Sequence, residues 1–364
     1  MARFKARIVM RNYRIALYPG DGVGPEVIAE AVRVLAAVEK RQDAFHLELT
    51  ELPWGYGFYR QTGRVAPDDF LHVLRPFDAI LLGAVGWPAE LPDHVTLDPL
   101  VRIRQSFDQY ACVRPARLLP GVPCVLTNKG PRDVDLVVIR ENSEGEYVNI
   151  GGRFHVGHPD ESAVQTAVHT RRGVERILRF GFRMALTRRQ RLTMITKSNA
   201  QRFAYVLWDE LLEQLRGEYP AVEVDKQHAD AAVMNFVRCP ERFDVVVASN
   251  LFGDILTDLG GLISGGLGLA PSSNLCPEGT APSMFEPVHG SAPDIAGKGI
   301  ANPIAAVLSA AMMLDWLGQA WAAGAVRGAV ERVLAAGEAT PDLGGRLSTS
   351  QLGQRLVEAI TSCD

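Results

Sequence analysis

The stretch RIALYPGDGVGPEVIAEAVRVL, residues 14–35, places a glycine-rich turn between an apolar run and a segment with helical periodicity. This pattern predicts a strand, a turn and a helix. A dinucleotide-binding fingerprint has glycine at the first, third and sixth positions of such a turn. Here Gly20, Gly22 and Gly24 occupy the first, third and fifth positions, and Pro25 occupies the sixth. The turn is therefore interpreted as a tight strand-to-helix connection in preference to a phosphate-binding loop, and the alternative that Asp21 and Gly22 line a cleft at the carboxyl end of the strand stays open.

Apolar, β-branched runs alternate with helical segments along the chain. The runs lie at 14–18, 77–83, 134–140, 191–196 and 243–250, and the helical segments at 27–40, 170–186 and 201–219. This alternation predicts an α/β fold with a largely parallel sheet. The alanine-rich end, about 301–336, predicts helices that pack closely on a sheet. A chain of 364 residues is long enough to divide into two domains.

Composition and charge exclude several classes of protein. A net charge of −4 argues against a basic face that binds nucleic acid. No apolar run reaches the roughly 18 residues of a membrane span. The basic leader, residues 1–14, lacks the apolar core of a secretion signal and is interpreted as a disordered tail or the start of the first strand. The five cysteines are widely spaced, which predicts reduced thiols in a cytoplasmic protein and no zinc site.

Three aspartates lie in apolar surroundings. Asp254 and Asp258 are four residues apart in SNLFGDILTDLGG and share one face of a helix. Like charges on one face repel, and a bound Mg²⁺ or Mn²⁺ ion, which prefers oxygen ligands, relieves that repulsion. The alternative is that one carboxylate interacts with the helix N-terminus and the other is solvated. Asp230, in KQHADAAVMNF, is a third candidate ligand that carries no signal by itself.

Four basic residues are candidates for binding or catalysis. Arg104 and Arg114 lie in VRIRQSFDQYACVRP, and Arg140 ends the apolar run of VDLVVIREN. Ligands of α/β sheets bind at the carboxyl ends of strands, and a guanidinium grips a carboxylate with two parallel hydrogen bonds. Each arginine alone is more often part of a surface ion pair worth about 0–1 kcal/mol. Lys197, in MITKSN, follows another apolar run and can act as a base in a partly dry cleft.

The segment SMFEPVHGSAPDIAGKGIANP, residues 283–303, is dense in turn-forming residues and predicts a loop. Its polar side chains include Glu286, His289, Asp294 and Asn302. Loops of this composition bring backbone amides and directional polar groups to a ligand. The same composition also fits a connection without chemistry, and on composition alone both interpretations stay open.

Taken in order, these motifs resemble those of one family. The chain is similar to the β-decarboxylating hydroxyacid dehydrogenases, which include isopropylmalate and isocitrate dehydrogenases, in GDGVGPE, the R-x₉-RP pair, RENSEGEY, TKSN, DAAVMNF, GDILTD and EPVHGSAPDIAGKGIANP. The likeness runs from about residue 14 to about residue 318. ITKSN and GLAPSSNLCPEGTAPSMFEPVHG look most like the tartrate and decarboxylating D-malate dehydrogenase branch. Leu97 stands roughly where isopropylmalate enzymes have an acidic residue.

The resemblance implies a two-lobed α/β fold with a shared twisted sheet, distinct from the Rossmann fold. An outer, cofactor-binding lobe is expected from residues 1–109 and 265–364. An inner lobe, residues 110–264, is expected to carry the metal ligands and the contacts of a homodimer. Lys197 and Asp230 are expected to reach into the active site of the partner subunit, so that a lone subunit lacks a complete site.

The implied activity is NAD-dependent and metal-dependent oxidation of a malate-like 2-hydroxy diacid, D-malate or tartrate, with β-decarboxylation. The resemblance assigns substrate binding to Arg104, Arg114 and Arg140, and Mg²⁺ or Mn²⁺ to Asp254, Asp258 and the partner subunit's Asp230. Lys197 is the implied base and Tyr147 the implied proton donor, with Asp230 beside them. Because all these residues are present, a non-catalytic relative is disfavoured.

Cofactor binding is assigned by the same resemblance to Glu286, His289, Gly290, Asp294, Ile295 and Asn302. Asp294 favours NAD, because a carboxylate accepts hydrogen bonds from ribose hydroxyls and repels the 2′-phosphate of NADP. The alternatives are 3-isopropylmalate dehydrogenase or another diacid dehydrogenase of the family, and a metal-dependent decarboxylase without redox chemistry.

Overall fold

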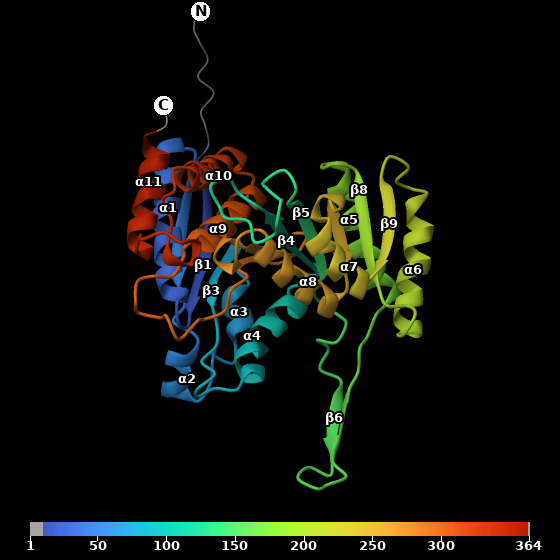
Figure 1. Cartoon of the computed structure of the whole chain (residues 1–364). Coiled ribbons are helices and arrows are strands. Elements are labelled where there is room, and N and C mark those ends of the chain that lie inside the picture. Colours follow the sequence, from blue (N-terminus) through green and yellow to red (C-terminus); the bar gives the residue numbers. More distant parts are fainter. Residues whose placement is uncertain (1–9, 363–364) are drawn as a thin grey trace, which may run out of the picture. The chain divides into compact units, whose positions relative to one another are not determined.

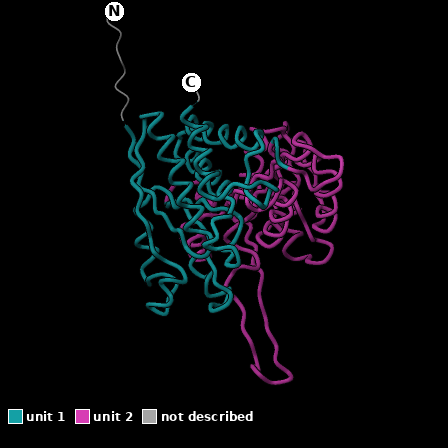
Figure 2. The backbone as a smooth tube through the Cα atoms, turned by 60° about the vertical axis from the view of Figure 1, so that its left-hand side comes forward, with its two compact units in different colours: residues 1–99, 120–122, 281–364 teal, residues 100–119, 123–280 magenta. Residues whose placement is uncertain are grey.

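The computed structural model describes residues 10–362, so most of the basic leader and Cys363 lie outside the described residues. The chain divides into two compact units (Figure 2). Unit 1 consists of residues up to 99 together with 120–122 and 281–364, and unit 2 consists of 100–119 and 123–280. Residues 100–109 and 265–280, which the sequence analysis assigns to the outer lobe, therefore group with unit 2.

Unit 1 contains four parallel strands in the order β2-β1-β3-β12, of which β1 and β3 are labelled in Figure 1. They are β1 (Arg11–Gly20), β2 (Phe45–Glu51), β3 (Ala79–Ala84) and β12 (Ser283–Pro287). The helices of this unit are α1 (Gly24–Gln42), α2 (Tyr56–Thr62), α3 (Phe70–Leu74), α9 (Ile304–Trp316), α10 (Ala320–Ala335) and α11 (Thr349–Thr361), and α4 (Asp93–Ser106) continues into unit 2. The strand and helix expected in residues 14–40 are β1 and α1.

The alanine-rich end forms helices as predicted. Nine of the thirteen residues of α9 are buried, and α9 packs against β3, β12, α1 and α10. Small side chains allow this approach, because they let the helix backbone come close to the strands.

The glycine-rich turn between β1 and α1 is a close backbone crossing. Gly20 and Gly22 have φ angles of +71° and +58°, which side chains disfavour. A Cβ atom on Gly20 would lie 1.9 Å from the carbonyl oxygen of Ala84, and one on Gly22 would lie 1.9 Å from that of Ser291. The predicted tight turn is therefore confirmed, and its glycines are needed for contact with protein backbone.

Asp21, at the tip of this turn, is a buried anchor. Its carboxylate accepts hydrogen bonds from the backbone N–H groups of Tyr56 (2.6 Å) and Gly86 (2.8 Å). The next residue but one, Val23, donates its N–H to the carbonyl oxygen of Ser291 (2.8 Å). The turn thus fastens three separate loops of unit 1, one of which is the predicted cofactor loop.

Unit 2 contains six strands in the order β11-β4-β5-β10-β8-β9. The strands β5, β10, β8 and β9 are parallel neighbours, whereas β4 is antiparallel to β5 and to β11. Their bounds are β4 (Ala111–Arg117), β5 (Asp135–Glu141), β8 (Arg191–Thr196), β9 (Glu223–His228), β10 (Val245–Ala248) and β11 (Pro271–Leu275). The predicted, largely parallel sheet is confirmed.

Four helices accompany these strands, and one hairpin extends from them. The helices are α5 (Arg171–Leu186), α6 (Arg202–Arg216), α7 (Ala229–Arg238) and α8 (Asn250–Ile263). The hairpin pairs β6 (Gly151–Phe154) with β7 (Ser162–Gln165) and projects from the rest of unit 2 (Figure 1). All eight residues of these two short strands are exposed.

Two expectations about composition can be compared with the structure. None of the helices in residues 10–362 has the length and apolar character that crossing a membrane requires. Four of the five cysteines are described, Cys112, Cys124, Cys239 and Cys276, and all four are free thiols. The prediction of reduced cysteines is confirmed for these four.

We predict that Gly20→Ala lowers the stability of the protein by about 1–3 kcal/mol, because the added Cβ meets backbone and the φ angle is strained. Gly324→Ala is the matched control, since Gly324 lies exposed inside α10 and a Cβ there meets nothing within 4 Å. The control is expected to be neutral or slightly stabilising. Thermal unfolding followed by circular dichroism measures both, and equal midpoints for the two variants would contradict the prediction.

Candidate active site

An ion pair between the buried Arg140 and the half-buried Asp254 joins strand β5 to helix α8. Arg140, near the end of β5, is 2% exposed and donates from Nη1 to Oδ1 of Asp254. Arg114, on β4, donates from Nη1 to the same oxygen at 3.3 Å. Burial acts to raise the pKa of Asp254, but the Arg140 and Arg114 guanidiniums hold it below its ordinary value. Asp254 is therefore an ionised carboxylate shared by two guanidiniums.

The register of the sheet brings Arg140 and Asp254 into contact. Arg140 lies beside Ala248, the last residue of β10, in the parallel β5–β10 pair. The chain then turns through Ser249 into α8, so the first turns of this helix lie next to Arg140. Gly253 is required there, because a Cβ at this position would lie 2.7 Å from Cβ and Cγ of Arg140.

Tyr147 completes the cluster. Its hydroxyl donates to Oδ2 of Asp254 at 2.8 Å, and the Arg140 guanidinium lies 5.0 Å from the centre of its ring. Burial, with a further contribution from Asp254, raises the pKa of Tyr147 above its ordinary value. The phenol is therefore protonated at neutral pH and able to donate a proton. Arg104, on α4, is also buried and its charge helps to lower the pKa of Asp254.

Asp258 lies one turn beyond Asp254 on α8 and differs from it. Burial and the charge of Asp254 raise the pKa of Asp258. No residue in 10–362 donates a hydrogen bond to its carboxylate. The two carboxylates thus lie one turn apart on α8, and of the two only Asp254 accepts hydrogen bonds from arginine.

Lys197 and Asp230 form a second, separate pair. Lys197 follows β8, Asp230 lies in the first turn of α7, and the ammonium donates to Oδ1 of the carboxylate at 2.5 Å. The hydrogen bond from Lys197 lowers the pKa of Asp230. Within the described chain, no three His, Cys, Asp or Glu side chains gather as a metal site. Asp230 therefore does not join Asp254 and Asp258 in one subunit.

Two glutamates of the RENSEGEY segment were not singled out by sequence reasoning. Glu141 is buried and accepts hydrogen bonds from the N–H and hydroxyl of Ser143 and from the N–H of Glu144. Glu144 accepts from the N–H and hydroxyl of Thr170, the N-cap of α5. They hold the loop that carries Tyr147. An acidic residue ending a strand, followed by serine two residues later, was an available signal for such a turn.

The predicted cofactor residues lie on β12 and the loop that follows it in unit 1. Nδ1 of His289 lies 3.0 Å from the carbonyl oxygen of Gly290, and because a carbonyl only accepts, Nδ1 carries the hydrogen. Burial lowers the pKa of His289, so the ring is neutral and Nε2 is an acceptor. Nε2 is buried without a hydrogen-bond partner among the described residues. It can accept a hydrogen bond from a ligand.

The other predicted cofactor residues differ in their burial and in their hydrogen bonds. Asn302 is buried, accepts the N–H of Ile304 at the start of α9 and donates to Asp342 (3.0 Å each). Asp294 is exposed and Ile295 half-buried, while Glu286 is buried on β12. A Cβ on Gly290 would meet nothing within 4 Å, so the space beside it is open.

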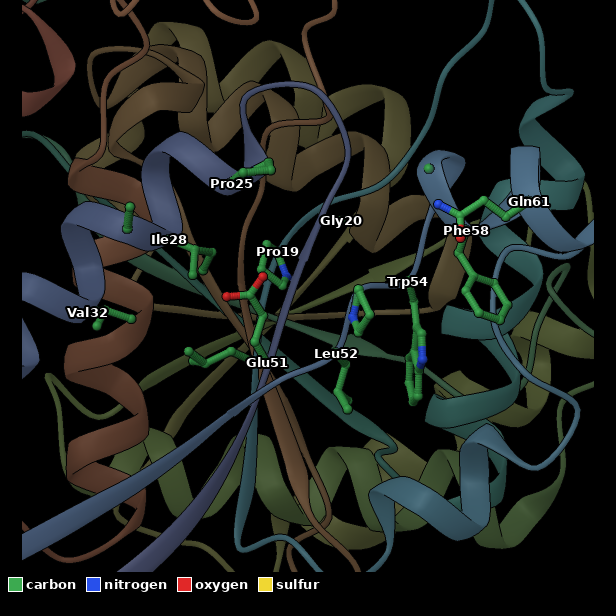
Figure 3. Close-up of a pocket in the computed structure, with 14 residues that line it drawn as sticks. Pro19, Gly20, Pro25, Ile28, Val32, Glu51, Leu52, Trp54, Phe58 and Gln61 are labelled. Carbon is green, nitrogen blue, oxygen red and sulfur yellow. The ribbon is translucent and has the colours of Figure 1, made fainter.

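A cavity of about 640 Å³ also lies in unit 1, beside the glycine-rich turn (Figure 3). Ile28 and Val32 of α1 line it together with Trp54 and Phe58, and Glu51 is the only charged residue among its lining. None of the predicted site residues contributes to its walls. This mostly apolar cavity is therefore distinct from the predicted site.

Comparison with known proteins places the chain among relatives that match it over nearly its full length. Residues 14–356 match the family described as isocitrate/isopropylmalate dehydrogenase. The chain is 49% identical over 360 residues to D-malate dehydrogenase [decarboxylating] of Escherichia coli (strain K12), covering 97% of this chain and 99% of the relative. It is 48% identical over 362 residues to tartrate dehydrogenase/decarboxylase of Pseudomonas putida, with the same coverages.

Solved structures agree with the sequence relatives. The crystal structure of isocitrate dehydrogenase from Methylococcus capsulatus matches with a TM-score of 0.86 and 36% identity, over 96% of this chain and 100% of that chain. The expected fold class is confirmed by this similarity. Because the family match covers most of the chain and relatives near 50% identity cover almost all of it, this protein belongs to the isocitrate/isopropylmalate dehydrogenase family.

Proposed function

We propose that this protein is an NAD-dependent and divalent-metal-dependent dehydrogenase that oxidises a malate-like 2-hydroxy diacid, D-malate or tartrate, with β-decarboxylation. The cluster of Arg114, Arg140, Asp254 and Tyr147 carries the proposal, because it places carboxylate-binding guanidiniums beside a proton donor and a metal-ligand carboxylate. The names of relatives near 50% identity, D-malate dehydrogenase and tartrate dehydrogenase/decarboxylase, support this substrate class.

The arginines bind the substrate in this proposal. Arg104, Arg114 and Arg140 hold the two carboxylates of the diacid, and Arg140 and Arg114 are already held in place by Asp254. Fixed guanidiniums lose little conformational entropy when a carboxylate binds, which favours a well-defined orientation of the carbon that reacts.

The donor set at α8 fits a divalent metal. Asp254, Asp258 and Asp230 of the partner subunit supply only carboxylate oxygens, which Mg²⁺ and Mn²⁺ prefer. Burial and the charge of Asp254 raise the pKa of Asp258, although Arg114 and Arg140 oppose this, and a bound cation would stabilise its ionised carboxylate. A bound ion polarises the oxygen of the substrate as a Lewis acid.

The loop after β12 fits NAD. The unpartnered Nε2 of His289 suits a donor such as the amino group of adenine, and the exposed Asp294 suits the hydroxyls of a ribose. Ile295 and Asn302 lie in the same loop, the open space at Gly290 admits a ligand, and Glu286 is assigned to the nicotinamide end. When bound there, NAD would supply the acceptor for the hydride of the hydroxyl-bearing carbon.

Two side chains move protons. Lys197 of the partner subunit takes the proton of the substrate hydroxyl as hydride leaves, which yields a ketone β to a carboxylate. Loss of CO₂ from that β-keto carboxylate leaves an enolate, and the Tyr147 hydroxyl delivers a proton to its carbon. The raised pKa of Tyr147 keeps this proton on the phenol until it is needed.

A homodimer with shared sites is part of the proposal. Several large apolar side chains on α7 and α8 are exposed in the single chain, among them Met234 (63%), Ile255 (53%) and Leu262 (53%). The hairpin β6–β7 exposes Phe154 and Val164 in addition. Contiguous exposed apolar side chains favour association, and a second copy burying α7 and α8 brings Lys197 and Asp230 to the other subunit's Asp254 and Asp258.

The proposed activity is tested with D-malate, tartrate and 3-isopropylmalate, each with NAD and Mn²⁺, while NADH absorbance is followed. We expect the highest kcat/KM for D-malate or tartrate, and a loss of more than about a hundredfold on chelation of the metal. A preference for 3-isopropylmalate would favour the first alternative. Release of CO₂ from oxaloacetate with no NADH formed from any diacid would contradict the proposal and favour a decarboxylase without redox chemistry.

Asp294→Lys combined with Ile295→Tyr is expected to shift the ratio of kcat/KM values toward NADP by about tenfold or more. The new ammonium and hydroxyl attract the 2′-phosphate, and the repelling carboxylate is gone. Asp294→Asn is the matched control for loss of charge alone and is expected to give a smaller shift. Steady-state kinetics with both nucleotides measures the ratio, and an unchanged ratio in the double variant refutes the assignment of Asp294.

Mixed dimers test the shared site. Lys197→Ala and Asp258→Ala are each expected to be inactive, but co-expression of the two should restore about a quarter of wild-type activity, because half of the dimers are mixed and each has one intact site. The control mixes Lys197→Ala with Asp230→Ala, which belong to the same half-site, and should stay inactive. Rescue in the control, or none in the test pair, would show that the sites are not shared in this way.

A further inference from the structure

Asn250 is a buried residue at the start of α8 to which no role has been assigned. It is 2% exposed, and its amide faces two different partners. Oδ1 accepts hydrogen bonds from Nε (2.9 Å) and Nη2 (2.6 Å) of Arg140, and Nδ2 donates to the carbonyl oxygen of Glu144 (2.9 Å). One side chain therefore connects the strand end at Arg140 to the loop that carries Tyr147.

The first contact fixes the plane of the Arg140 guanidinium. A single oxygen that accepts from Nε and Nη2 occupies one edge of the planar fork, and Asp254 accepts from Nη1 on the opposite side. Rotation of the guanidinium about its stem breaks both contacts at once. The stem itself packs on α8 at Gly253, where a side chain does not fit. The direction of the remaining N–H groups, which the substrate needs, thus depends on Asn250.

The second contact fixes the position of Tyr147. The loop passes over Asn250 so closely that a Cβ on Gly145 would lie 3.0 Å from Cβ of Asn250. The Arg140 guanidinium, which Asn250 orients, lies over the Tyr147 ring, with its central carbon 5.0 Å from the centre of the ring. Tyr147 is therefore held from two directions, through the carbonyl oxygen of Glu144 and through Arg140.

We infer that Asn250 is a positioning residue that sets, with one amide, both the carboxylate-binding edge of Arg140 and the location of the proton-donating Tyr147. Asn250 touches neither reacting atoms nor cofactor in this role, and it acts through its two neighbours. The inference rests on the proposed function, which supplies the roles of Arg140 and Tyr147. The geometry that links the three residues stands independently of those roles.

Asn250→Ala tests the inference kinetically. We expect the KM for the diacid to rise and kcat to fall, with a combined loss in kcat/KM of about 10- to 100-fold, because both groups lose their alignment. The KM for NAD should stay within about twofold, since Asn250 bonds to none of the predicted cofactor residues. Asn250→Ser, which keeps a small polar side chain at this buried position after the N-cap Ser249, serves if the alanine variant folds poorly.

The matched control is Ser264→Ala at the other end of α8. Ser264 is also buried and its hydroxyl donates within α8, to the carbonyl oxygen of Gly261. It contacts neither Arg140 nor Tyr147, so its variant should keep wild-type kinetics while it reports the cost of weakening the helix. Equal kinetics of the Asn250 and Ser264 variants would overturn the inference.

A double-mutant cycle with Arg140→Lys separates positioning from a merely structural role. Lysine lacks the rigid fork that Asn250 orients, so Asn250→Ala in that background should lower kcat/KM clearly less than in the wild type, and the loss that remains reports the contact with the Tyr147 loop. Fully additive losses would overturn the inference. A crystal structure of Asn250→Ala gives a readout without turnover, in which the Arg140 guanidinium should rotate and the Tyr147 loop should shift.

A failure of the proposed function can be distinguished from a failure of the inference about Asn250. A wild-type protein that turns over none of the diacids sinks the proposed function, and the crystal structure of Asn250→Ala still decides whether Asn250 positions Arg140 and Tyr147. A wild-type protein that is active, with Arg140 and Tyr147 unmoved in the variant, sinks only the inference.

Discussion

The carboxylate of Asp254 shared by Arg114 and Arg140 is the interaction on which the rest of the site depends. A buried guanidinium is tolerated only when an anion and hydrogen-bond acceptors surround it. Arg140 meets this condition with Asp254 and Asn250 together. The end of β5, the start of α8 and the Tyr147 loop are held against one another, because the end of β5 carries this buried charge and the other two segments contact it.

The two aspartates of α8 differ in their charge environment as a result of this arrangement. Asp254 is neutralised by arginine and receives the Tyr147 hydroxyl, so it serves as an organiser of the site even without a metal. Asp258 has a raised pKa and no such neutralisation. In the proposed enzyme, a divalent ion would therefore relieve Asp258 more than Asp254, and its arrival completes a site that the arginines have already ordered.

The glycine-rich turn of unit 1 shows how a motif can look like a ligand site and be structural. Its glycines are needed because backbone from Ala84 and Ser291 lies where side chains would be. Asp21, whose pKa is raised by burial although two backbone N–H groups oppose this, holds two loops. The hydrogen bond from Val23 to Ser291 joins the turn to the predicted cofactor loop and helps to fix the conformation of that loop. No proposed role brings the turn into contact with a phosphate group.

The sequence by itself determined the alternation of strands and helices, the failure of the dinucleotide fingerprint and the resemblance to one family, because periodicity and motif order are local properties of the chain. It nominated Arg140 from its place at the end of an apolar run and Asp254 from its spacing to Asp258, whereas Tyr147 was nominated only through that resemblance. Tertiary structure alone decided that Asp254 meets a guanidinium 114 positions away, that Lys197 pairs with Asp230, and that Asn250 links Arg140 to Glu144. The contacts of Arg140 depend on the register of β5 against β10, and the Lys197–Asp230 pair depends on that of β8 against β9. All of them depend also on the direction of short hydrogen bonds, and none of these properties gives a periodic pattern in the sequence.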